Sequence, residues 1–274
     1  MLEHLILYTR AGLCNRMRAI ASVKRISSRT GARCTIAWPW GDYRSVFDDD
    51  TEWMPCDAFF YAAPADYYYI RHKLVQEGGN RDNWRVPVTT HRRIAVQSLY
   101  VFGAAEEPVL RFADVFSWVP KPSPVVREKV KAFRDDCLPA KVVGIHMRRT
   151  DHRMAIMCSP DIVFFEEADR AVEEGFELFL ATDNAATLRT MSQRYGSKLH
   201  HRKKHSERAQ RWPRMDFAIE DVLDDMIDLW LLAGCDHVVG SAGSSYSRMA
   251  IALNGASRCR FAVVADLIPS AKWW

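Results

Sequence analysis

The sequence lacks the short motifs that assign many nucleotide-binding proteins to a class. No G-x-G-x-x-G run follows a segment that predicts a strand, which argues against a Rossmann-type dehydrogenase or methyltransferase. No GKS or GKT is present, so the chain carries no Walker motif. Any nucleotide site must therefore be built from other residues.

Long apolar segments are also missing. A membrane-spanning helix needs about 20 mostly apolar residues, and the strongest run, residues 226–235, carries Asp228 inside it. The first residues, MLEHLILYTR, have neither the basic start nor the long apolar core of a signal peptide. We therefore expect a cytoplasmic protein with no transmembrane segment.

Paired cysteines are missing as well. The 7 cysteines are scattered, and none forms a C-x-x-C pair. This spacing argues against a disulfide framework and against a zinc site, whose ligands come in close pairs. We expect reduced, mostly buried thiols and no bound metal.

The positive charge is confined to one segment. The chain has a net charge of +4, while residues 198–214 hold seven Lys or Arg and one Glu, which gives 7 − 1 = +6 locally. Lysine and arginine can neutralise nucleic-acid phosphates, but only Trp212 offers a stacking ring there. We expect no nucleic-acid partner, and the segment is interpreted as a solvated loop or as a flap over a diphosphate.

The composition is that of a folded protein, and the order of elements predicts an α/β architecture. With 274 residues, 48% of them hydrophobic, the chain can form one large domain or two small ones. Residues 4–8 and 32–38 predict strands, and between them a helix capped by Asn15 runs to Gly31. Strand, helix and strand make one βαβ unit, so a parallel sheet follows.

The second half repeats this alternation after a proline-rich stretch. Residues 119–126 (VPKPSPVV) predict a linker, which separates domain 1–121 from domain 122–274. Beyond the linker, strands and helices alternate to the end, whereas the aromatic-rich residues 39–120 give no clear pattern. Ligands of open parallel sheets bind at the carboxyl ends of the strands, so residues there are the candidate site.

Three predicted strands end in polar residues. The run GIHMRRTD delivers Arg148 and Arg149, whose guanidiniums suit a pyrophosphate and can stabilise a leaving diphosphate. Asp183 follows a second strand, where it can bind a ribose or a base or cap a helix. A third strand runs into GSAGSS, whose small residues and serines suit a phosphate at a helix N-terminus or a tight capped turn.

Three motifs together resemble the inverting fucosyltransferase superfamily. They are AGLCNRMRAIAS near the start, GIHMRRTD in the middle and DMIDLWLLAGCDHVVGSAGSSYS near the end. The superfamily includes the nodulation and core α1,6-fucosyltransferases and, more distantly, protein O-fucosyltransferases. The resemblance implies a GT-B fold, with two Rossmann-like domains facing across a cleft. It also implies that the N-terminal half binds a glycan acceptor and the C-terminal half binds GDP-fucose, without a cofactor or an essential metal.

The resemblance also implies roles for single residues. Arg148 and Arg149 would face the diphosphate, and His146 would shape the site. The remaining donor-binding residues would be Asn15, Arg16, Asp183, Asp228, Ser244 and Ser245. The core α1,6 enzymes carry a glutamate base a few residues after the arginines, but no Glu stands at the matching place here. Asp151 and His152 are therefore the local candidates for the base.

Other interpretations remain open. Residues 48–50 are three aspartates that could bind a metal in the other glycosyltransferase fold, but a solvated turn is favoured because no apolar strand precedes them. The donor could be a UDP- or dTDP-linked sugar, which would use the same arginines. A protein that binds a nucleotide or a glycan without turnover is the third alternative.

Overall fold

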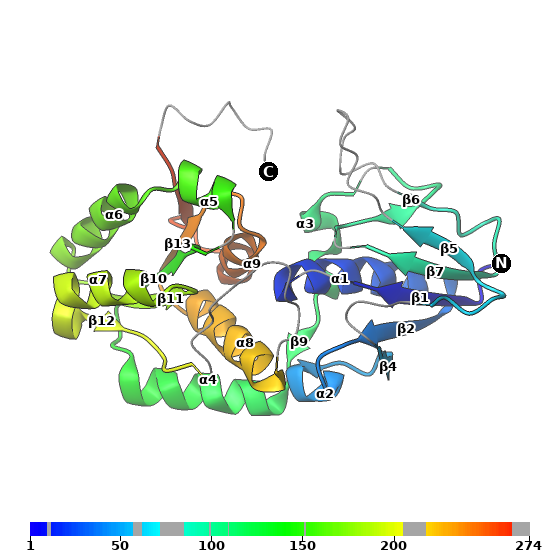
Figure 1. Ribbon diagram of the computed structural model, residues 1–274, viewed down its shortest axis with the longest axis horizontal. Coiled ribbons are helices and arrows are strands. Elements are labelled where there is room, and N and C mark those ends of the chain that lie inside the picture. Colours follow the sequence, from blue (N-terminus) through cyan, green and yellow to red (C-terminus); the bar gives the residue numbers. More distant parts are fainter. Residues whose placement is uncertain are drawn as a thin grey trace. The chain divides into compact units, whose positions relative to one another are not determined.

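The computed structural model describes residues 1–9, 12–56, 62–71, 85–98, 100–108, 110–150, 152–204 and 218–264. The chain divides into two compact units (Figure 1). Unit 1 takes in Met1–Val125 and the start of helix α8, and unit 2 holds most of the remaining chain. Asp151 and residues 205–217 lie outside the described residues, so the sequence predictions that fall on them stay predictions.

Unit 1 is built on a five-stranded parallel sheet in the order β4-β2-β1-β7-β5. The strands of this sheet are β1 (His4–Tyr8), β2 (Arg33–Trp38), β4 (Glu52–Pro55), β5 (Tyr68–Arg71) and β7 (Arg93–Gln97). Two small ladders accompany it, β3 (Phe47–Asp48) with β9 (Lys121–Pro122) and β6 (Arg85–Val86) with β8 (Gly103–Ala104). The helices of unit 1 are α1 (Leu13–Thr30), α2 (Tyr43–Val46), α3 (Phe112–Val115) and the 3₁₀ turn η1 (Phe116–Trp118).

The predicted βαβ unit is present as β1, α1 and β2. All five residues of β1 are buried, as expected for a central strand of a parallel sheet. Helix α1 ends at Gly31, which adopts the left-handed conformation (φ 70°) that glycine tolerates best. The predicted cap was wrong, because the N-cap is Gly12 and Asn15 lies in the first turn.

Unit 2 has a second five-stranded parallel sheet in the order β12-β11-β10-β13-β14. Its strands are β10 (Val142–Met147), β11 (Glu177–Thr182), β12 (Leu199–His200), β13 (His237–Ser241) and β14 (Arg260–Ala262). The helices are α4 (Pro124–Cys137), α5 (Arg153–Cys158), α6 (Asp161–Glu173), α7 (Ala185–Tyr195), η2 (Gly196–Lys198), α8 (Ile219–Ala233) and α9 (Ser245–Asn254).

The strand order of unit 2 reverses between β10 and β13. From β10 the chain adds β11 and β12 on one side, and it then crosses to β13 and β14 on the other. Such a reversal separates the loops that leave the two central strands, and ligands of open α/β sheets bind in the resulting crevice. The topology therefore points to the residues after β10 and β13.

Two sequence interpretations differ from the structure. The proline-rich stretch contains the division between the units after Val125, but it is not an unstructured linker, because Lys121–Pro122 pair with β3 and α4 begins at Pro124. The acidic triplet is a solvated turn only in part, because Asp48 and Asp50 are exposed whereas the Asp49 side chain is 3% exposed, binds Lys24 at 2.9 Å and accepts a hydrogen bond from the Tyr43 hydroxyl. Among the described residues, no helix is long and apolar enough to span a membrane.

The packing of α9 on β13 gives a test of the fold of unit 2. A Cβ on Gly240 would lie 2.6 Å from the Cβ of Ser247, so Gly240→Ala must push α9 off the sheet. We expect a loss of about 1–3 kcal/mol in the free energy of unfolding, as for other overpacked sites. Urea denaturation measures it.

Gly12→Ala is the matched control. A Cβ on Gly12 meets nothing within 4 Å, and the backbone there (φ −60°) suits alanine. We expect a change below about 1 kcal/mol. Equal losses in the two variants would contradict the packing described for α9.

Candidate active site

The chain leaving β10 is tied to the end of β13 through one serine. The hydroxyl of Ser241 accepts a hydrogen bond from the backbone N–H of Arg148 at 2.9 Å and donates to the carbonyl of His146 at 3.2 Å. Ser241 is completely buried. This contact places the arginine run at the point where the strand order reverses.

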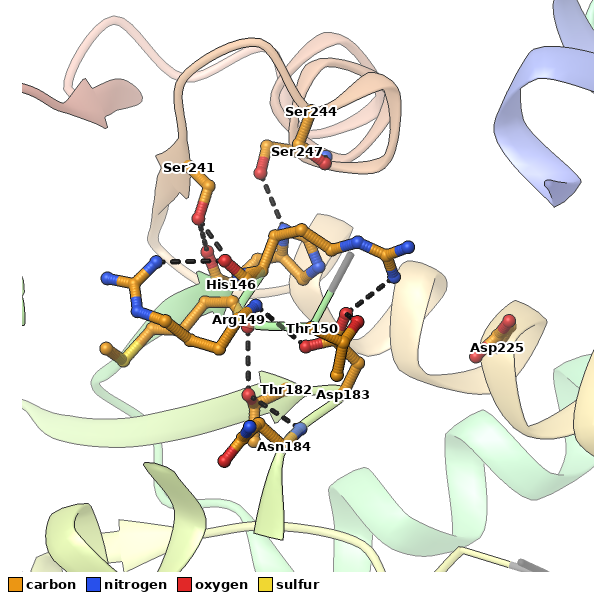
Figure 2. A network of polar contacts seen from close by, with 12 residues as sticks. His146, Arg149, Thr150, Thr182, Asp183, Asn184, Asp225, Ser241, Ser244 and Ser247 are labelled. Carbon is orange, nitrogen blue, oxygen red and sulfur yellow. Dashed lines mark hydrogen bonds and ion pairs between the residues drawn. The ribbon is translucent and has the colours of Figure 1, made fainter. Parts of the chain in front are cut away.

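The carboxylate of Asp183, just past β11, organises the same run (Figure 2). One oxygen accepts the backbone N–H of Arg149 at 2.8 Å, and the other accepts the hydroxyl of Thr150 at 2.7 Å. That second oxygen also binds the guanidinium of Arg148 at 2.6 Å. Asp183 therefore positions all three residues, and only 8% of its side chain is exposed.

The two arginines have different surroundings. The Arg149 side chain is 7% exposed, with Nη2 donating to the carbonyl of Ser159 at 2.6 Å and Nε to Asp161 at 2.5 Å. Its guanidinium lies 5.1 Å from the ring of Phe164. By contrast, 28% of the Arg148 side chain is exposed. Arg148 is thus the more accessible of the two cations, whereas Arg149 is held inside unit 2, and contact of either arginine with a diphosphate stays a prediction.

His146 lies beneath this run and is neutral. Its Nδ1 is 2.6 Å from the hydroxyl of Ser247, and its ring lies 4.6 Å from that of Tyr246. Burial lowers the pKa of His146 to about 3, and the positive charge of Arg148 acts in the same direction. The imidazole therefore packs against Ser247 and Tyr246 without adding charge, and its role in shaping a donor site stays a prediction.

The turn between β13 and α9 forms the opposite side of the site. Ser244 caps α9, because its hydroxyl accepts the backbone N–H of Ser247 at 3.3 Å. Gly243 has a φ of +73°, and Ser245 is the first residue of the helix. The positive end of the α9 dipole therefore faces the turn and favours an anion there. Direct contact of Ser244 and Ser245 with phosphate stays a prediction.

Asp228 belongs to a neighbouring ionic cluster on α8. Its side chain is 2% exposed, and its two oxygens bind Arg202 at 3.1 Å and Lys204 at 3.0 Å. Arg202 also binds Asp224 at 2.8 Å, so this part of the basic segment is docked on α8 and is not a solvated loop. Tyr246 connects the cluster to His146 by donating its hydroxyl proton to the carbonyl of Asp225 at 2.6 Å.

The predicted residues of unit 1 lie near the start of α1. Arg16 is fully buried, its guanidinium centre lies 4.0 Å from the Trp40 ring, and it donates to the carbonyl of Thr9. The side-chain oxygen of Asn15 accepts from Arg18. Their approach to a donor sugar stays a prediction, and so does the role of Asp151.

Sequence analysis missed several residues that hold the site together. Ser159 is fully buried; its hydroxyl accepts the backbone N–H of Ala242 at 2.8 Å, and its carbonyl accepts from Arg149. The roles of Thr150 and Ser241 were also missed. The available signal for Thr150 and Ser241 was their place at or next to a strand end, and for Ser159 it was its place just before the start of α6. Within the described residues no group of three His, Cys, Asp or Glu could hold a metal ion.

Buried neutral His146 makes stability depend on pH. Because its folded-state pKa, about 3, lies below the ordinary 6.5, the unfolded chain binds a proton first as the pH falls. The contribution of His146 is therefore complete above pH 6.5 and is lost progressively toward pH 3. One pKa unit corresponds to about 1.4 kcal/mol, so a shift from 6.5 to about 3 makes the loss on the order of 5 kcal/mol.

Denaturant unfolding at a series of pH values measures this loss. The stability of His146→Gln should fall less steeply with decreasing pH than that of the wild type. His201→Gln, at an exposed histidine, should leave the slope unchanged. A parallel decline in wild type and His146→Gln would contradict the neutral state of His146.

The structure is similar to solved fucosyltransferases. No family model and no curated protein matches the sequence. The α-1,6-fucosyltransferase NodZ co-crystallised with GDP has a TM-score of 0.54 and 16% identity, and the match covers 91% of this chain and 92% of that one; NodZ has also been solved from Bradyrhizobium.

Two further structures show the same likeness. A variant of Arabidopsis thaliana FUT1 in complex with GDP gives a TM-score of 0.59 at 15% identity, covering 93% of this chain and 69% of that one. POFUT1 in complex with GDP gives 0.54 at 12% identity, covering 94% and 97%. The predicted GT-B fold class is confirmed, because the chain shares its fold with these structures.

Proposed function

We propose that the protein is a glycosyltransferase that moves fucose from GDP-fucose to a glycan hydroxyl, with inversion and without an essential metal. The observation that carries the proposal is the partly exposed Arg148, which Asp183 holds at the strand-order reversal of unit 2. The structural neighbours that were solved with GDP support the choice of nucleotide. We also propose that residues 122–274 hold the donor and residues 1–121 face the acceptor.

In the proposed reaction, the leaving group is the nucleoside diphosphate. The acceptor oxygen forms a bond to the anomeric carbon while the bond from that carbon to the diphosphate oxygen breaks. The electron pair stays on the diphosphate, and the hydroxyl proton passes to a base. The developing negative charge needs a fixed cation, and a guanidinium can bind two phosphate oxygens at once.

The site supplies this charge stabilisation from its own residues. The guanidinium of Arg148 is held by the Asp183 carboxylate, so little reorganisation is needed when a diphosphate arrives. The N-terminus of α9 adds backbone dipoles of the same sign. In this mechanism Asp151 is the proposed base, on the strength of its sequence position alone.

Thermal denaturation with a panel of nucleotides tests the donor. A ligand that binds only the folded state raises the melting temperature according to its affinity. We expect a rise with GDP, and none of similar size with UDP, dTDP, CMP or S-adenosylmethionine, with or without EDTA. A rise with UDP or dTDP would contradict the donor, and a rise that EDTA abolishes would contradict metal independence.

Substitution of the arginines tests the site. Arg148→Ala should lower the turnover of GDP-fucose about a hundredfold, since a transition-state contact of about 3 kcal/mol is lost. Arg194→Ala, which breaks a surface pair with Asp169, is the control and should leave turnover unchanged. Arg149→Ala should mainly lower the melting temperature, because that side chain is buried. Full turnover by Arg148→Ala would contradict the site assignment.

A further inference from the structure

His152 follows the arginine run and caps the short helix α5. Its Nδ1 accepts a hydrogen bond from the backbone N–H of Ala155 at 3.0 Å, and its carbonyl accepts from Ile156 at 3.1 Å. A neutral imidazole has one nitrogen that donates and one that accepts. Because Nδ1 is the acceptor, the proton of the neutral ring must be on Nε2.

This tautomer decides what His152 can do. The lone pair of Nδ1 points at the helix backbone, and Nε2 already carries a proton. The ring therefore has no lone pair with which to take a proton from an acceptor hydroxyl while the cap is formed. His152 was one of two local candidates for the base, and in this geometry the nitrogen that remains for a ligand, Nε2, is a hydrogen-bond donor.

The ring lies beside the β13–α9 turn. Its Cε1 is 3.5 Å from the position that a Cβ on Gly243 would take, and Nε2 is bonded to that Cε1. The other end of α5 is tied to the same turn, because the hydroxyl of Ser159 accepts from Ala242 at 2.8 Å. Nε2 has no hydrogen-bond partner among the residues that the structure describes.

We propose that His152 donates its Nε2 proton to a phosphate oxygen of the nucleoside diphosphate, and that it does not act as the catalytic base. The proposal rests on the proposed function and deepens it. A phosphate oxygen is the expected acceptor, because the α9 N-terminus and the Arg148 guanidinium both favour an anion at this end of the sheet. His152 would then bind the nucleoside diphosphate of the donor substrate, because its tautomer places the proton on Nε2.

The variant His152→Asn separates the two roles of His152, the N-cap of α5 and the hydrogen-bond donor at Nε2. Asparagine is among the best N-cap residues, so His152→Asn keeps an oxygen for the Ala155 N–H but removes the Nε2 donor. We expect an unchanged melting temperature without ligand and about tenfold weaker binding of GDP in calorimetry, the size of one hydrogen bond to a charged group. Asp42→Asn, at the N-cap of α2 in unit 1, is a matched change of cap at a residue with no assigned role in GDP binding and should bind GDP as the wild type does.

The outcomes distinguish this proposal from the proposed function. If the wild type does not bind GDP, both fail. If the wild type binds GDP and His152→Asn binds it equally well, only the role of His152 fails. A loss of kcat in His152→Asn with unchanged GDP affinity would indicate that His152 acts as the catalytic base, and it would overturn the proposal.

The tautomer can be observed independently of activity. Two-bond ¹H–¹⁵N correlation spectra of the histidine rings distinguish a proton on Nε2 from one on Nδ1. We expect His152 to show the Nε2–H pattern in the ligand-free protein, assigned by its absence from His152→Asn. The Nδ1–H pattern would overturn the proposal.

Discussion

The carboxylate of Asp183 is the interaction on which the candidate site depends. It accepts the backbone N–H of Arg149 and the hydroxyl of Thr150, and it also binds the Arg148 guanidinium. Charge-assisted bonds to a mostly buried carboxylate are stronger and shorter than neutral ones. They hold the chain after β10 in one conformation, so the guanidinium that would meet a ligand is already oriented.

Arg148 and Arg149 are adjacent in the GIHMRRTD motif, but their side chains have different contacts. Both residues follow β10 directly, but their guanidiniums bind different carboxylates, Arg148 that of Asp183 and Arg149 that of Asp161. Arg149 turns inward to Ser159, Asp161 and Phe164 and helps to fix α5 and α6. Arg148 keeps part of its surface exposed.

Close backbone packing and side-chain hydrogen bonds together hold the elements around the site in place. Gly240 allows α9 to pack closely on β13, which brings Ser247 to the buried His146. Ser159 and Ser241 then tie α5 and the end of β10 to the same strand end. These small residues satisfy backbone groups that would otherwise be buried without partners, and such groups are costly to leave unpaired.

The sequence by itself determined the βαβ alternation, the positions of most strands and helices of unit 2, and the strand ends where Arg148, Asp183 and Ser244 lie. Periodicity and glycine or serine caps are local signals, so they can be recognised without tertiary contacts. The strands of residues 39–120 were not predicted: β4 and β5 are short and only partly buried, so their apolar pattern is weak, and β7, although as long as β1, lies in a stretch without a clear alternation of elements.

Only the tertiary structure decided which of these residues act together. It paired Asp183 with Arg148, turned Arg149 inward, docked Arg202 on α8 and set the tautomer of His152 through a backbone N–H. Each of these outcomes depends on a distance between residues that are separated in sequence or on the direction of a single side chain. A sequence pattern gives the residue types at a strand end, but hydrogen-bond geometry and burial set their charge, orientation and accessibility.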